Sequence, residues 1–274
     1  DVDEENVFKV AFNSANELMS ELKEIFDKVV DKKWTDHRDP YEEFCSKILE
    51  KPYIAIELIK VLPLSVIQLC DLFWKKQPPK HDKFGFGYER DSMESRYGLT
   101  EKHKFDYFPS SANQTPIKWL LQIEFYKTLD FIIDFTNRAV ESYSKSDYGK
   151  EDVVQVTLHI NETEATQYLS GAIWNMYRGN GSPVVPHILQ SIHMSLESIL
   201  LEFAQISKSE LIQQILLLIL IKSKSASLTS IVCSVILANP DKFYDIALIL
   251  FKTIEMFNYD VLRCANEFQA KSLY

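Results

Sequence analysis

The residues with the most evident capacity for chemistry form a glycine-rich turn at positions 178–182, Arg-Gly-Asn-Gly-Ser. Backbone amides of such a turn ahead of a helix can bind an anion. This turn follows a predicted helix instead of a strand, and it lacks the Gly-Lys-Ser/Thr ending of a phosphate-binding P-loop. We therefore interpret Gly179 as the residue that ends one helix, with a tight turn leading to the next.

Histidine and acidic residues have no spacing typical of a metal site or a catalytic site. His187 and His193 are six positions apart and therefore do not share a helix face. His159 lies near Glu162 and Glu164, but no third histidine or cysteine is placed beside them by spacing. We predict no metal, no cofactor and no catalytic residue.

Residues 77–115 are the better candidate for ligand contact. They combine Pro, Gly, Ser, charged and aromatic residues in nearly forty positions, and loops of this length are usually functional or disordered. The predicted contact residues are aromatic or basic: Phe84, Phe86, Tyr88, Arg90, Arg96, Tyr97, Lys102, His103 and Lys104. The alternative is an insertion that folds back on the helices and buries its own aromatic side chains.

Composition restricts the class of protein. The chain has 274 residues, of which 46% are hydrophobic and 25% charged, as in ordinary globular proteins. Its net charge of −9 argues against nucleic acid as a partner. The four cysteines lie in apolar helical contexts without zinc spacing, which indicates reduced thiols and a cytoplasmic location. The most apolar run, residues 215–221, is far shorter than the ~20 residues of a membrane span, so no membrane contact is expected.

Apolar residues at three- and four-residue spacing predict helices over most of the chain. The predicted helices cover residues 3–32, 39–49, 52–62, 63–74, 116–144, 162–177, 183–205, 207–221, 228–238, 241–253 and 259–269. Only residues 153–160 alternate as a strand does. We predict an all-α fold of solenoid-like, helical-repeat hairpins with one isolated strand and a long aromatic-rich loop. Its segments are residues 1–76, 77–115 and 116–274, in one continuous domain of a larger protein.

Residues on both sides of the turn at 178–182 are predicted to hold the two helices of this hairpin against each other. An ion pair between Arg178 and Glu197 under an aromatic cover would fix the register of its two helices. The residues assigned to this role are Trp174, Tyr177, Arg178, Gly179, Pro183, Met194 and Glu197.

Four motifs in the second half of the chain resemble a segment of very large bacterial proteins, the STAND-type NTPases of antiviral defence (the AVAST group). The motifs are W-x-x-Y-R-G at 174–179, P-H-x-L-x-S-x-x-M-x-L-E at 186–197, S-x-x-x-A-N-P-D-K-x-x-x-x-A-L-x-L-F at 234–251 and M-F-N-Y-D-V-L-R at 256–263. The resemblance covers residues 173–267. It implies helical repeats beside an ATPase core, which in that family sense a phage protein. It implies no catalytic residue, and the chain has no Walker A motif.

These observations favour a non-enzymatic helical recognition or scaffold module of a larger STAND-type NTPase. Its expected partners are a protein, by the resemblance a phage protein, and other domains of the same chain. Two alternatives remain open. One is a stand-alone protein-interaction scaffold, and the other is a helical nuclease or hydrolase that uses Asp, Glu and His around residues 77–115.

Overall fold

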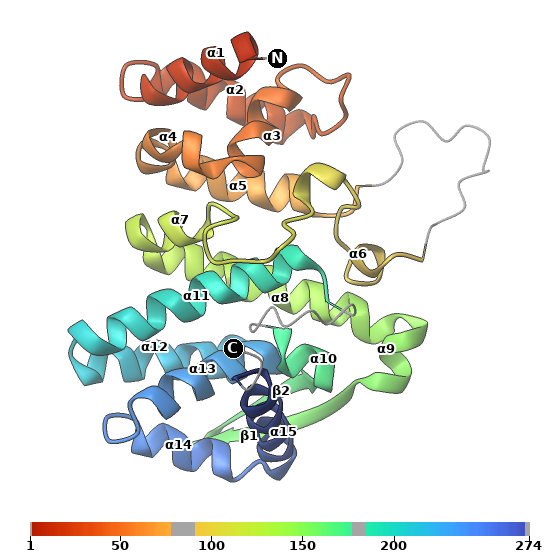
Figure 1. Cartoon of the computed structure of the whole chain (residues 1–274), viewed down its shortest axis with the longest axis vertical. Coiled ribbons are helices and arrows are strands. Elements are labelled where there is room, and N and C mark those ends of the chain that lie inside the picture. The colour runs from red at the N-terminus through yellow and green to blue at the C-terminus, as the bar shows by residue number, and fades with distance from the viewer. Residues whose placement is uncertain (1, 78–90, 177–184, 272–274) are drawn as a thin grey trace.

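A computed structural model of the chain describes residues 2–77, 91–176 and 185–271. The predominantly helical prediction is confirmed, because 69% of the chain is helical and the described part contains fifteen α-helices. Figure 1 shows an elongated molecule with α1 and α2 at one end of its long axis and α14 and α15 at the other. None of the helices in the described ranges is both long and apolar enough to cross a bilayer.

The first segment contains six helices. They are α1 (Val2–Asn13), α2 (Met19–Lys32), α3 (Glu42–Glu50), the 3₁₀ helix η1 (Pro52–Ile54), α4 (Ile56–Val61) and α5 (Pro63–Trp74). Proline at the first helical position starts α5 as predicted, because its fixed φ suits a helix and its missing N–H needs no partner there. The single helix predicted over residues 3–32 is instead the pair α1 and α2, separated by a turn at residues 14–18.

The described part of the long loop is folded against the helices. It contains α6 (Met93–Arg96) and the 3₁₀ helix η2 (His103–Phe105). Its buried aromatic residue Tyr107 accepts a hydrogen bond from Trp74 Nε1 at 3.1 Å and donates one to the carbonyl of Leu49 at 3.0 Å. Burial raises the pKa of this phenol well above its usual value. The loop is therefore fixed to both α3 and α5.

The second half of the chain contains the remaining elements. They are α7 (Ile117–Ile123), α8 (Phe125–Lys145), α9 (Asp147–Asp152), β1 (Val154–Ile160), β2 (Thr163–Leu169), α10 (Gly171–Trp174), α11 (His187–Ile206), α12 (Ser209–Lys222), α13 (Ala226–Ala238), α14 (Tyr244–Phe251) and α15 (Ile254–Lys271). The helix predicted over 116–144 reverses at Glu124, so that α7 and α8 pack against each other.

The predicted isolated strand is wrong, and of the described residues in the helix predicted over 162–177 only α10 (Gly171–Trp174) is α-helical, because residues 163–169 form β2. β1 pairs with β2 in an antiparallel hairpin, in which Val156 faces Gln167 and Leu158 faces Ala165. Asn161 has φ 54° in the connecting turn, a conformation that asparagine tolerates well. Backbone pairing satisfies the strand hydrogen bonds that an isolated strand would leave open.

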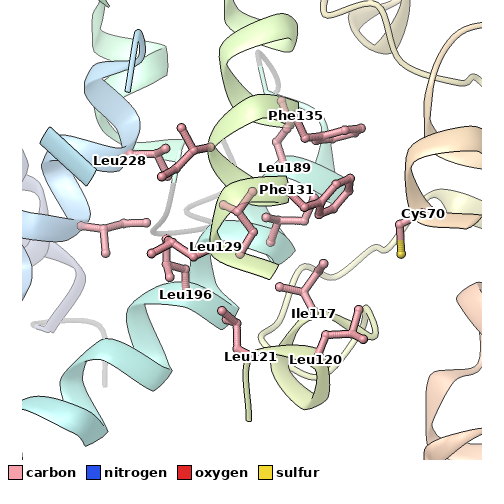
Figure 2. Close-up of a cluster of buried hydrophobic side chains, with 14 of the residues drawn as sticks. Cys70, Ile117, Leu120, Leu121, Leu129, Phe131, Phe135, Leu189, Leu196 and Leu228 are labelled. Carbon is pink, nitrogen blue, oxygen red and sulfur yellow. The ribbon is translucent and has the colours of Figure 1, made fainter. Parts of the chain in front are cut away.

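Helices stack in a regular order along the long axis. On one side α1 packs against α4, α4 against α7 and α7 against α11, whereas on the other α2 packs against α5 and α5 against α8 (Figure 1). Buried apolar residues of all three predicted segments belong to one continuous cluster. Figure 2 shows part of this cluster, where Leu129, Phe131 and Phe135 of α8 lie beside side chains of α11, with those of α7 next to them.

Candidate functional site

The predicted contact residues of the long loop lie partly outside the described ranges. Phe84, Phe86, Tyr88 and Arg90 are outside them. Arg96, Tyr97, Lys102, His103 and Lys104 are described. The structure does not bring these five together at one exposed surface.

Arg96 and Tyr97 make internal contacts. The Arg96 guanidinium donates two hydrogen bonds to the carboxylate of Asp91, at 2.7 and 2.8 Å, and lies 3.6 Å from the centre of the Tyr148 ring. The Tyr97 ring is buried and stacks on Tyr143, with 4.4 Å between ring centroids and 2° between ring planes. These contacts fix α6 to α8 and α9, which corresponds to the alternative in which the loop folds back.

Lys102 and Lys104 surround a buried carboxylate. Glu42, at the start of α3, is only 4% exposed. Its Oε1 accepts a hydrogen bond from Lys104 Nζ at 2.5 Å, and Lys102 Nζ lies 3.5 Å away. Lys102 also donates to the carbonyl of Thr35, and burial lowers the pKa of its ammonium group. Both lysines therefore neutralise a charge inside the protein.

An acid–histidine pair joins the same loop to α11. Asp106 Oδ1 lies 2.7 Å from His187 Nδ1 at the start of α11, and the Phe108 ring, 70% exposed, lies 5.1 Å from the imidazole. A recess of about 160 Å³ beside this pair is also lined by His103. The two paired residues are 81 positions apart, so no sequence spacing indicated them. Among the described residues, no three His, Cys, Asp or Glu side chains could hold a metal ion.

A groove of about 830 Å³ runs across α2, α5 and α8. Its apolar lining consists of Val30, Ile67, Leu72 and Phe131. Its charged lining consists of Lys33, Asp71, Lys75, Lys76, Asp134, Arg138, Glu141 and Lys224. Five cations against three acids make the groove locally positive on a chain of net charge −9.

Ion pairs organise the middle of this groove. Asp71 of α5 accepts from Lys75 Nζ at 2.5 Å and from Arg138 of α8, so one carboxylate neutralises two cations and ties the two helices together. Lys76 donates to Ser95 Oγ at 2.8 Å. In contrast, Lys33 and Lys224 make no ion pair with any residue in the described ranges. A hydrogen bond from Lys145 lowers the pKa of the nearby Glu141 carboxyl, and the charge of Lys224 adds to this effect. The ammonium groups of Lys33 and Lys224 stay outside a close ion pair with the described residues and can approach an anionic group of a ligand.

Sequence reasoning did not find the groove. Lys33 follows the end of α2 and Lys75 follows the end of α5, positions where lysine is common because it complements the helix dipole. Because this local role accounts for each lysine separately, the sequence does not indicate that the two lysines line the same groove. The helices α2, α5 and α8 come together only in the tertiary structure.

The residues predicted to hold the hairpin around 178–182 together fall only partly within the described ranges. Tyr177, Arg178, Gly179 and Pro183 lie outside the described residues, so the predicted Arg178–Glu197 pair stays a prediction. Trp174 is fully buried and Met194 is half-buried. Glu197 Oε1 accepts a hydrogen bond from Ser234 Oγ at 2.5 Å, which links α11 to α13.

A buried polar network fixes the register of α11 against α13. The fully buried His193 has Nδ1 2.7 Å from the carbonyl of Leu189 and Nε2 2.8 Å from Ser227 Oγ. Because a carbonyl only accepts, Nδ1 carries the proton and Nε2 accepts from the Ser227 hydroxyl. Burial lowers the pKa of His193 to about 4. The network has no exposed atom for a substrate to reach, and we interpret it as structural.

Comparison with protein-family models and with curated proteins found no match to this chain, so the groove and the acid–histidine pair are the observations from which a function is argued.

Proposed function

We propose that this chain is a non-enzymatic recognition module that binds a segment of another protein in the groove across α2, α5 and α8. The supporting observation is that side chains from three successive helical layers line one continuous groove. Helical-repeat proteins create extended binding surfaces in this way, because each layer contributes one strip of the surface. We accordingly propose a solenoid-like repeat, with α1, α4, α7 and α11 on one side and α2, α5 and α8 on the other.

The groove chemistry suits a protein segment that is both apolar and acidic. Val30, Ile67 and Leu72 offer partly buried apolar surface, and Lys33 and Lys224 offer two ammonium groups outside the internal ion pairs. A ligand would gain by burying apolar side chains between the helices and by placing carboxylates near these lysines.

We also propose that the module belongs to a larger bacterial STAND-type NTPase of antiviral defence, located in the cytoplasm, and that its ligand is a phage protein. The described residues of the supporting motifs lie at the end of α10 and just after it, in α11, and from α13 to α15, and none of them lines the groove. A stand-alone scaffold would have the same groove. An open reading frame that continues into a Walker A motif would separate the larger NTPase from the scaffold.

The test is a selection of displayed phage-protein fragments on the immobilised 274-residue chain, followed by affinity measurements on two charge-reversal variants. Lys224→Glu alters an exposed cation of the groove. Lys127→Glu is the matched control, since it makes the same change at an exposed position of α8 that does not line the groove. We expect Lys224→Glu to weaken binding of the selected fragments roughly tenfold, about 1.4 kcal/mol, and Lys127→Glu to leave it unchanged. Equal effects of the two variants, or no enriched fragment, would contradict the proposal.

The Asp106–His187 pair is the one observation that favours the hydrolase alternative. A carboxylate that orients a histidine is a common arrangement for a general base. The assay is hydrolysis of nitrophenyl esters and phosphodiesters, with and without Mg²⁺ or Mn²⁺, by the wild type and by His187→Ala. We expect no activity from either protein. Turnover by the wild type that is lost in His187→Ala would establish the enzyme instead.

A further inference from the structure

The helix α15 carries a row of exposed apolar side chains. Its inward positions include Met256, Tyr259, Asp260 and Arg263, and Arg263 Nε donates to Asp260 Oδ1 at 2.8 Å. Its outward positions include Ile254, Phe257 and Val261, which are 68%, 49% and 52% exposed, beside the polar residues Glu255 and Asn258. An ordinary surface helix turns its apolar residues towards the core and exposes the polar ones.

The outward residues have the spacing of a helix–helix seam. Ile254, Phe257, Val261 and the exposed Cys264 follow the alternating three- and four-residue steps of a coiled-coil heptad. Leu262 adds a further exposed apolar side chain beside them. A stripe of this kind packs against another helix when one is present.

The neighbouring helix α14 enlarges this apolar face. Tyr244, Leu248 and Phe251 are also exposed, and the Phe251 ring lies 6.1 Å from the Phe257 ring. A fully exposed aromatic side chain presents roughly 150–250 Å². The exposed apolar side chains of α14 and α15, each about half exposed, therefore present on the order of 700 Å², close to the ~800 Å² that each partner contributes to a standard-size interface.

The face is also hollowed and nearly neutral. A recess of about 200 Å³, lined by Leu237, Phe251 and Phe257 at α13–α15, is of a size to receive one apolar side chain. Residues 241–264 contain three basic and four acidic residues, so the opposite charges along these two helices almost balance.

We propose that the outward face of α14 and α15 binds the same face of a second copy of this chain. A surface that meets itself across a two-fold axis must complement itself, and a near-neutral apolar stripe with its own recess satisfies this condition. The face lies at the opposite end of the molecule from α1 and α2 (Figure 1), so this association is independent of the proposed groove ligand.

The experiment is analytical ultracentrifugation of the whole chain over a series of concentrations. The wild type is expected to reach twice the chain mass of 31.8 kDa, and Phe257→Glu/Val261→Glu is expected to remain monomeric. The matched control is Val7→Glu/Val10→Glu on α1, which replaces two apolar residues that are more exposed, 65% and 67%, and adds the same charge, and it is expected to dimerise like the wild type. Thermal melting is expected to be alike in all three proteins, because all four altered side chains are exposed.

A second measurement follows the exposed thiol of Cys264. Its reaction with a maleimide is expected to slow as the wild-type concentration rises and to stay constant in Phe257→Glu/Val261→Glu. The proposal is overturned if the wild type stays monomeric at the highest concentration, if the α15 variant dimerises, or if the α1 control loses dimerisation equally.

Discussion

Lys104 Nζ lies 2.5 Å from Oε1 of Glu42, a residue 62 positions earlier in the chain. This ion pair gives a residue predicted to contact a ligand an internal role, because Glu42 is almost fully buried. It fixes the end of the long loop to the start of α3.

Replacing Lys104 by Met is expected to destabilise the fold by about 2 kcal/mol, because it leaves a buried carboxylate with weaker compensation. Urea unfolding measures the effect. Lys23→Met is the control, since Lys23 pairs with Asp27 at an exposed position of α2 and should lose little stability. Equal effects of the two substitutions would show that the Glu42 pair is no stronger than a surface pair.

Stability should depend on pH through His193. Its pKa is about 4 in the folded protein and near 6.5 in an unfolded chain, so below pH 6.5 the unfolded state binds the additional proton. The buried neutral His193 therefore contributes about 3 kcal/mol to the free energy of unfolding. This contribution is fully present above pH 6.5 and is lost as the pH falls towards 4.

The measurement for His193 is urea unfolding at pH 7 and at pH 4.5 in the wild type and in His193→Asn. The variant is expected to be less stable at pH 7 and to lose less stability on acidification. His37→Asn, at an exposed position, serves as the control and should keep the wild-type difference between the two pH values. A His193→Asn variant with that same full difference would show that another group is responsible.

Tyr107→Phe is expected to cost about 2 kcal/mol, because it leaves the buried Trp74 N–H and Leu49 carbonyl without their partner. Chemical unfolding followed by tryptophan fluorescence measures this loss. Tyr53→Phe removes a hydroxyl from an exposed tyrosine and should be neutral. A neutral Tyr107→Phe would mean that water replaces both hydrogen bonds.

Gly149→Ala and Gly171→Ala should behave differently. A Cβ at Gly149 would lie 1.8 Å from the carbonyl oxygen of Tyr143, so α9 would have to move, whereas a Cβ at Gly171 would lie 3.6 Å from the Tyr259 ring, an ordinary contact. We expect a loss of about 3 kcal/mol for Gly149→Ala and little change for Gly171→Ala. Thermal unfolding of both variants checks the contrast, and similar melting temperatures would contradict it.

The sequence by itself determined the helical class and many of the helix positions. The repeat of apolar residues every three or four positions is a local property, and proline marks helix starts locally, as at Pro63 of α5. The alternation of residues 153–160 likewise identified β1.

Only the tertiary structure decided what these elements contact. Residues 163–169 become a strand because β1 supplies their hydrogen bonds and because buried Gln167 is held by the Leu220 carbonyl and Thr229. The chain reverses at Glu124 without a glycine or proline, and α7 and α8 then pack against each other and against α5, while α7 also contacts α4 and α11. The groove and the Glu42–Lys104 pair join residues that are far apart in the chain. Local sequence patterns do not indicate contacts of this kind.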